Sequence, residues 1–184
     1  MEGADYVQPR FRSIEYFGIR LPKNSSYVSL AEEFVSPSAN KMSKGGQKLS
    51  DNVADLRARE EREPIARFLK MRLAELTPGY AKVMMKLAPE YQNFNGLIFG
   101  GTIMAIADQA FAYASNSLVH PSIASQFNIH FVAGANDGDE LTAECWVVKS
   151  GRRVGISEMK VTNQEGKIIA KATGTTIPVA EFNH

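Results

Sequence analysis

The chain has 184 residues, a length that suits one domain with an extension. Its formal net charge of +1 implies no general attraction to nucleic acid or to an anionic membrane surface. The single cysteine, Cys145, excludes an internal disulfide and fits a reducing, cytoplasmic compartment. Met1–Arg20 lacks the apolar core of a secretory signal, and no stretch reaches transmembrane length.

The N-terminal segment shows no clear periodicity. Prolines interrupt residues 1–50, and Ser36–Ser50 is rich in Ser, Gly, Lys and Asn, a composition typical of an arm and linker. Within this segment Ser29–Val35 is a short helix candidate, with Ser29 as its N-cap. We therefore predict an N-terminal extension over residues 1–50 and a folded domain over residues 51–184.

The predicted domain begins with helical sequence and continues into a hairpin. Asp51–Lys70 is a helix candidate, in which Pro64 either introduces a kink or starts a second helix. Pro78-Gly79 is a turn signal between two strand-like segments, Arg72–Thr77 and Tyr80–Leu87. This part of the chain therefore predicts one or two helices followed by a β-hairpin.

A polar loop and a long helix follow, over Asn93–Leu118. After Gly100-Gly101 the residues are good helix formers and are apolar nearly all round, a pattern typical of a buried helix. The first N–H groups of a helix lack intrahelical partners, and glycine lets a ligand oxygen approach them closely. Gly100 and Gly101 are therefore suited to polarise a bound carbonyl group.

Asp108 is the one carboxylate in this apolar run. Burying an unpaired carboxylate is costly, so we expect Asp108 to line a cavity, to find a partner or to have a shifted pKa. Two interpretations stay open: a carboxylate hydrogen-bonded to a neighbouring turn, or a general base in a cleft. Asp108 lies about 10 Å along the helix axis from Gly100, too far for one small ligand to bridge easily within one subunit. A site shared between two subunits would remove this difficulty.

The remainder of the chain has the period of β-strands. Glu140–Lys149 alternates with Leu141, Ala143, Cys145 and Val147 on one face. Polar or glycine-containing turns separate the predicted strands, which are Ile123–Val132, Glu140–Lys149, Val154–Thr162 and Lys167–Pro178. We expect three successive hairpins in an antiparallel sheet that wraps around the helix, which gives an α+β fold.

Most other chemically active patterns are absent or have a simple structural interpretation. The chain has three histidines and no G-x-S-x-G, P-loop or C-x-x-C motif, which leaves little material for a zinc site or a catalytic triad. Asp137-Gly138-Asp139 predicts a turn. We expect His130 to be a surface residue and Cys145 to be a core residue. Arg152 and Arg153 belong either to a solvated turn or to a phosphate-binding cluster.

The spacing of the loop, helix and strands resembles that of a known family. The loop and helix carry two motifs: Asn93-x-x-Gly96-x-x-x-Gly100-Gly101 and Ile106-Ala107-Asp108-x-Ala110-Phe111-Ala112-x-Ala114-x-Asn116-Ser117. Further matching positions lie at Ala124-Ser125, Ile129-x-Phe131, Gly138-Asp139-x-Leu141-Thr142-Ala143, Gly151-Arg152-Arg153 and Gly166-Lys167-x-x-Ala170. Together they resemble the hot-dog-fold acyl-CoA thioesterases, closest to the phenylacetate-pathway (phenylacetyl-CoA-type) subfamily, over roughly residues 69–178.

The resemblance implies a fold, an assembly and a reaction. The fold would be a long central helix wrapped by a five- to six-stranded antiparallel sheet, outside which the N-terminal extension lies. Two subunits would pair sheet to sheet as a homodimer, often within a dimer of dimers, with the site at the dimer interface. The reaction would be hydrolysis of acyl-CoA or aryl-acyl-CoA to a free acid and CoA. It would use no metal and no cofactor other than the coenzyme A of the substrate, and no nucleic acid or membrane partner.

The resemblance also implies roles for individual residues. Asp108 would be the general base or the nucleophile, the Gly100 N–H would polarise the thioester carbonyl, and Asn93 would position the substrate or water. The positions implied to bind substrate are Phe99, Gly101, Ser125, Arg152 and Arg153.

Phe99 is the main departure from the family pattern. The family usually has His-Gly-Gly where this chain has Phe99-Gly100-Gly101, and a second histidine found earlier in the loop is Asn95 here. Phenylalanine cannot donate a hydrogen bond to a thioester oxygen, and losing one such donor lowers the rate by about 100- to 1000-fold. The alternatives are therefore a slow thioesterase and a non-catalytic acyl-CoA-binding module. A third hypothesis, a ligand-sensing regulator that binds DNA, rests only on a weak helix-turn-helix pattern over Leu30–Phe34.

Overall fold

The computed structural model of the chain describes residues 15–16, 19–20 and 44–179 and divides it into two compact units, Met1–Lys41 and Met42–His184. In the first unit, β1 (Glu15–Tyr16) pairs antiparallel with β2 (Ile19–Arg20). The helix expected over Ser29–Val35 lies outside the described residues, and the division of the chain at residue 50 stays a prediction.

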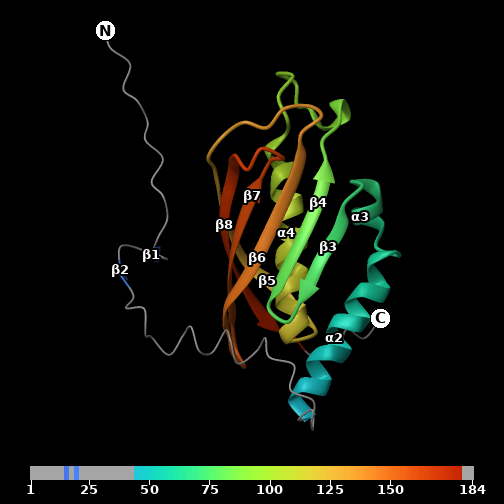
Figure 1. Cartoon of the computed structure of the whole chain (residues 1–184), viewed down its shortest axis with the longest axis vertical. Helices are drawn as coiled ribbons and strands as arrows, with labels where there is room; N and C mark the ends of the chain where they lie inside the picture. Colours follow the sequence, from blue (N-terminus) through green and yellow to red (C-terminus); the bar gives the residue numbers. More distant parts are fainter. Residues whose placement is uncertain (1–14, 17–18, 21–43, 180–184) are drawn as a thin grey trace. The chain divides into compact units, whose positions relative to one another are not determined.

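The second unit contains a six-stranded antiparallel sheet and one long helix (Figure 1). Its helices are α2 (Lys44–Glu60), α3 (Pro64–Phe68), the short 3-10 helix η1 (Pro89–Tyr91) and α4 (Gly100–Leu118). Its strands are β3 (Arg72–Thr77), β4 (Tyr80–Lys86), β5 (Ser122–Phe131), β6 (Glu140–Ser150), β7 (Gly155–Thr162) and β8 (Ile168–Pro178). α4 packs along one face of the sheet, so the predicted α+β architecture is confirmed.

The strand order β3-β4-β6-β7-β8-β5 corrects one of the predicted hairpins. β6 with β7 and β7 with β8 are hairpins as expected, but β5 pairs with β8 and not with β6. In the sheet, β8 and β7 lie between β5 and β6, so the connection that contains the turn at Asn136–Asp139 is a crossover and not a hairpin. Turn composition marks where a chain changes direction, but it does not choose the neighbouring strand. As a result, β5 is an edge strand.

The first helix begins earlier than expected. α2 starts at Lys44, within the segment predicted to be a linker, and it ends before Pro64. Pro64 then starts α3, which confirms the alternative of a second helix over that of a kink. Gly45 and Gly46 weaken the helical signal of the sequence. Leu56 is buried, so α2 is stabilised by packing against the rest of the unit. Helix propensity alone does not predict where α2 starts.

The core lies between α4 and the sheet. Leu141, Ala143 and Cys145 are fully buried on the inner face of β6, as their alternation predicted. The largest fully buried side chain of α4 is Phe111, which packs edge to face against Phe127 with ring centroids 5.9 Å apart. Burial of side chains from both layers holds α4 in place on the sheet. The loop before the helix and the turn after it are held with it.

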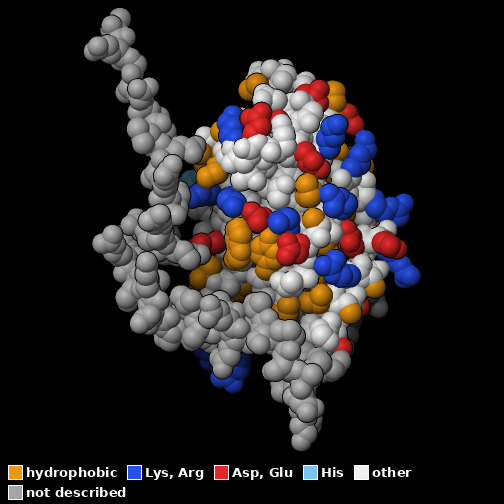
Figure 2. All heavy atoms as spheres, viewed as in Figure 1, with side chains coloured by type: hydrophobic (Ala, Val, Ile, Leu, Met, Phe, Trp, Pro, Cys, Tyr) orange, Lys and Arg blue, Asp and Glu red, His pale blue; other side chains and the backbone are white. Residues whose placement is uncertain are grey.

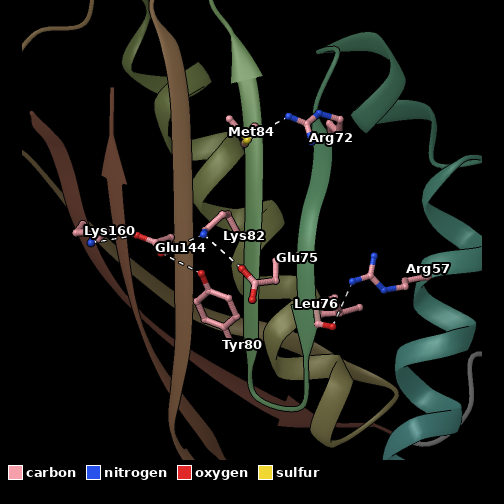
Figure 3. Close-up of polar contacts among 9 residues, drawn as sticks. All are labelled: Arg57, Arg72, Glu75, Leu76, Tyr80, Lys82, Met84, Glu144 and Lys160. Atoms are coloured by element: carbon pink, nitrogen blue, oxygen red, sulfur yellow. Dashed lines mark hydrogen bonds and ion pairs between the residues drawn. The ribbon is translucent and has the colours of Figure 1, made fainter. Parts of the chain in front are cut away.

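The outer face of the sheet carries a ladder of charged side chains, a composition suited to contact with water. Figure 2 shows acidic and basic side chains interspersed over this side of the molecule. Lys82 lies between Glu75 and Glu144, with Nζ to carboxylate distances of 3.3 and 3.9 Å, and Lys160 lies 3.0 Å from Glu144 (Figure 3). Tyr80 donates a hydrogen bond of 2.9 Å to Glu144.

Gly174 allows Phe111 to reach the sheet, and this contact predicts a stability change. A Cβ on Gly174 would lie 2.6 Å from the Phe111 ring, whereas a Cβ on Gly134 would meet nothing within 4 Å. Gly174→Ala should therefore lower the free energy of unfolding by about 1–3 kcal/mol through overpacking. Urea denaturation of both variants tests this, with Gly134→Ala expected to stay close to the wild type. An equal decrease in the free energy of unfolding of the two variants would show that the close contact with Phe111 is not the cause.

Candidate active site

The loop before α4 places Asn93 beside the start of that helix. Gln92 and Ile98 form an isolated β-bridge, and the Phe99 N–H donates to the Tyr91 carbonyl at 2.8 Å, so the loop closes on itself. Asn93 Oδ1 accepts hydrogen bonds from the N–H groups of Asn95 at 2.9 Å and Leu97 at 3.3 Å. The side-chain carbonyl thus shapes the loop, while the Asn93 Nδ2 donates to no acceptor in the described part of the chain.

The first turn of α4 combines free backbone donors with two aromatic rings. The Gly100 N–H has no intrahelical acceptor, because it belongs to the first turn. The Phe131 ring lies over Gly100, where a Cβ would come within 3.1 Å of it, and the Phe99 ring lies so close over Gly101 that a Cβ there would overlap it. Phe99 and Phe131 are nevertheless 57% and 53% exposed. The two glycines therefore accommodate aromatic rings as well as leaving backbone donors open.

Asp108 lies on an exposed stripe of α4 with Met104 and Ala112, one turn before and one turn after it. This corrects the expectation of a helix buried all round: in the single chain one side of α4 is open. Among the described residues Asp108 has no hydrogen-bond or ion-pair partner, which removes the interpretation of a carboxylate bonded to a neighbouring turn. The surrounding protein displaces part of its hydration and raises the pKa of the carboxyl above its ordinary value.

Ser125 lies on β5 at an irregularity of the ladder with β8, where the register shifts between Ala124 and Gln126. Its side chain is exposed, and Ser125 Oγ donates to the Thr175 carbonyl at 3.2 Å. Bulges of this kind turn a side chain out of the regular alternation and are frequent next to active sites.

Arg152 and Arg153 lie in the exposed turn between β6 and β7. This turn is at the end of the sheet where α4 finishes, since the Gly79 N–H beside it donates to Ser117 Oγ at 2.8 Å and the Val147 N–H donates to the Gly79 carbonyl at 2.8 Å. Gly100 and Asn93 lie at the opposite end. Within one chain the structure therefore brings Asn93, Gly100 and Phe99 together but keeps the two arginines apart from them.

Three residues have the structural roles that their sequence context predicted. His130 is exposed on β5, and burial of Cys145 raises the pKa of its thiol to about 12, which leaves the thiol unreactive. Asp139 closes the turn before β6 by accepting from the Asn136 N–H at 2.9 Å and from Gln164 Nε2 at 2.9 Å. In the described part of the chain no group of three or more His, Cys, Asp or Glu side chains could hold a metal ion, and no helix is long and apolar enough to cross a membrane.

A polar cluster next to Asp108 had no signal in the sequence. Glu63, at the start of α3, accepts hydrogen bonds from Gln109 Nε2 at 2.6 Å and from the Tyr113 hydroxyl at 2.7 Å, both on α4. About 50 residues of chain separate the partners, so no local motif could mark the pair. The cluster ties the junction of α2 and α3 to the same helix that carries Asp108.

Comparison with known proteins shows the family. Residues 95–170 match the model of the thioesterase superfamily. A relative in Archaeoglobus fulgidus is 38% identical over 113 residues, which cover 61% of this chain and 73% of the relative. The acyl-coenzyme A thioesterase PaaI of Escherichia coli is 32% identical over 114 residues, which cover 62% of this chain and 81% of PaaI. The chain belongs to the thioesterase superfamily.

Solved structures, that of PaaI among them, share the hot-dog fold seen here. The structure of E. coli PaaI, from the phenylacetic acid degradation operon, superposes with a TM-score of 0.68 at 29% identity and covers 72% of this chain and 96% of PaaI. The smu.793 protein of Streptococcus mutans, bound to acetyl CoA, has a TM-score of 0.58 at 25% identity and covers 60% of this chain and 90% of that protein. The resemblance stated from the sequence is therefore confirmed at the level of family and fold.

The two polar atoms of Asn93 predict different effects for two substitutions. Asn93→Asp keeps an oxygen that accepts from the Asn95 and Leu97 N–H groups but loses the Nδ2 donor. It should keep the melting temperature of the wild type and lower kcat/KM for an acyl-CoA thioester. Asn93→Ala loses both and should also lower the free energy of unfolding by about 1 kcal/mol. Thermal unfolding and initial rates on both variants test this, and full activity in Asn93→Asp would remove Asn93 from the site.

Proposed function

We propose that this chain hydrolyses acyl-CoA thioesters to a free acid and CoA. The observation that carries the proposal is Asp108, an exposed carboxylate with a raised pKa and no partner among the described residues, on the helix whose first turn offers free N–H donors. The named activity of its relative PaaI supports the same reaction. The alternative of a non-catalytic acyl-CoA-binding module is not favoured by these relatives.

The separation of the two groups along α4 supports a homodimer. Gly100 and Asp108 are eight residues apart on one rigid helix, which corresponds to roughly 12 Å. β5 is an edge strand of ten residues, most of them exposed, so it is open for pairing with a second copy. Antiparallel pairing about a two-fold axis would bring the Phe131 end of one β5 next to the Ser122 end of the other. Gly100 of one subunit would then approach the partner's Asp108 across the interface.

In this arrangement each site draws on both subunits. The Gly100 N–H and the helix dipole of one subunit would hold the thioester oxygen, and the partner's Asp108 would act on the carbonyl carbon. The partner's Arg152 and the partner's Arg153 would lie at the mouth, near the phosphates of CoA. Asn93 Nδ2 and Ser125 Oγ are the remaining polar groups that would position the thioester or the water.

Two chemical routes fit these groups. In the first, Asp108 removes a proton from water, the hydroxyl adds to the carbonyl carbon, and the C–S bond breaks as the proton passes to the thiolate of CoA. In the second, the Asp108 carboxylate attacks the carbonyl carbon, CoA leaves, and water hydrolyses the resulting anhydride. Both routes need Asp108 ionised, and both place negative charge on the oxygen held by Gly100. Coenzyme A enters only as part of the substrate.

Asp108→Asn tests the base or nucleophile. The amide has nearly the same shape but cannot take a proton or attack, so hydrolysis should be lost while acyl-CoA binding persists. The raised pKa means that the folded protein disfavours the ionised carboxyl, so this variant should be at least as stable as the wild type at neutral pH. Steady-state rates, calorimetric binding and thermal unfolding measure the three effects. Asp137→Asn, an exposed turn residue, is the matched control, and unchanged turnover in Asp108→Asn would show the assignment to be wrong.

The same pKa shift predicts the pH dependence of the wild type. The ionised form is the active one, so activity should be present above the Asp108 pKa and lost as the pH falls through it. Because the pKa is raised, this acid limb of kcat/KM should lie above the range of an ordinary aspartate. A pH–rate profile measures it, and an acid limb at or below the ordinary aspartate range would contradict the account.

Phe99→His tests the departure from the family pattern. If only one polarising donor is missing, the histidine should raise the rate by the equivalent of about 1–3 kcal/mol of barrier, mainly in kcat. Phe94→His is the matched control, since Phe94 lies in the same loop and is 97% exposed. A slower Phe99→His would instead show that the Phe99 ring packs on the acyl group. Binding without turnover in the wild type and in Phe99→His would establish the binding-module alternative.

A further inference from the structure

A groove lies between α2 and α4, on the side of α4 that carries Asp108. Its volume is about 730 Å³, within the range of small-molecule sites. One wall comes from α2 and the residues after it, the other from α4, and the groove ends near the start of β5. The residues of α2, of the segment after it and of α4 that line the groove include Asp55, Leu56, Ala58, Arg59, Arg62, Glu63, Gln109 and Ala112.

The groove begins beside Asp108, which does not itself line it. Gln109, which lines it, follows Asp108 directly, and Ala112, which also lines it, is one helical turn beyond Asp108 on the same exposed stripe. The α4 side of the groove continues to Asn116 and so extends about 10 Å along the helix. A thioester carbon held at Asp108 could therefore extend its acyl chain directly into the groove.

Hydrogen bonds on both sides of α2 hold the groove open in its present shape. On the sheet side, Glu60 Oε1 accepts from the Leu73 N–H at 2.7 Å, and Arg57 donates to the Leu76 carbonyl at 3.3 Å (Figure 3). On the α4 side, Glu63 accepts from Gln109 and Tyr113. A site whose walls are fixed before binding loses less conformational entropy when the ligand enters.

The chemistry of the lining favours a neutral, apolar ligand. Leu56, Ala58 and Ala112 contribute apolar surface. The charged lining residues named above balance, because Asp55 and Glu63 are acidic and Arg59 and Arg62 are basic, and Asp55 pairs with Arg59 at 2.8 Å. Since no excess of positive charge remains, the phosphates of CoA would gain little there, whereas a hydrocarbon chain would replace water on apolar walls.

We propose that this groove binds the acyl chain of the substrate and that it selects aliphatic chains of medium length over short ones. The inference rests on the proposed hydrolysis of acyl-CoA, because it takes Asp108 as the point where the thioester carbon lies. It assigns the choice of acyl group to α2, which lies entirely outside the part of the chain that matches the family model.

Ala58→Phe tests the assignment by filling the groove from the α2 side. Ala58 is exposed and lines the groove, while Ala54 is exposed on the same helix but does not line it, so Ala54→Phe is the matched control. We expect Ala58→Phe to lower kcat/KM for decanoyl-CoA at least about tenfold while acetyl-CoA changes little, in line with the discrimination that hydrophobic pockets achieve. Ala54→Phe should leave both values near the wild type. Ala58→Leu replaces Ala58→Phe if the larger side chain prevents folding.

The outcomes separate the groove from the reaction. If the wild type hydrolyses both substrates and Ala58→Phe leaves their ratio unchanged, the groove assignment is overturned and the thioesterase function stands. If the wild type hydrolyses no acyl-CoA, the proposed function fails. The groove is then judged by calorimetric binding of decanoyl-CoA and acetyl-CoA to the same three full-length proteins. Selective weakening of decanoyl-CoA binding in Ala58→Phe supports it, and equal affinities overturn it.

Discussion

The rigidity of α4 is the constraint on which the rest of the site depends. A helix holds its first turn and a residue eight positions later at a fixed separation of roughly 12 Å, so Gly100 cannot approach Asp108 of the same chain. The core fixes the helix on the sheet through Phe111, for which Gly174 leaves room. Gly100 and Asp108 are therefore held in place, but neither can complete the other's site within one chain. The open edge of β5 offers the means to complete them with a second copy.

The glycines at the start of α4 have two functions in this account. They leave backbone donors accessible, and they also make room for the rings of Phe99 and Phe131. The ring of Phe99 covers the first turn of α4, at the position where the family pattern implied by the sequence resemblance has histidine. The N–H of Gly100 then remains as the donor to the thioester oxygen, and the neighbouring surface becomes more apolar. The loss of one donor and the gain of an apolar wall are consequences of the same substitution.

Local patterns predicted most of the fold, and long-range contacts account for what they missed. Alternation along β6 and the turn signals gave the strands nearly to the residue, since both depend on adjacent side chains. The predicted neighbour of β5 was wrong, because its pairing with β8 joins chain segments some fifty residues apart. Asp108 stood out because a carboxylate in an apolar helix is unusual in any context. Glu63 and the groove beside it could not be found, because Glu63 bonds to Gln109 and Tyr113 only once α2 packs against α4.

The central claim is that each site combines Gly100 of one subunit with Asp108 of the other, and mixing two inactive variants tests it. Gly100→Pro removes the N–H, and it suits the fold because Phe99 already has the extended conformation that precedes proline, with φ −66° and ψ 126°. Gly100→Ala keeps the N–H and controls for contact with Phe131. When Gly100→Pro and Asp108→Asn proteins are unfolded together and refolded, half of the dimers should be mixed and one of their two sites intact. About a quarter of wild-type activity should therefore be recovered. No recovery, in a mixture shown to contain mixed dimers, would place both groups in one subunit and contradict it.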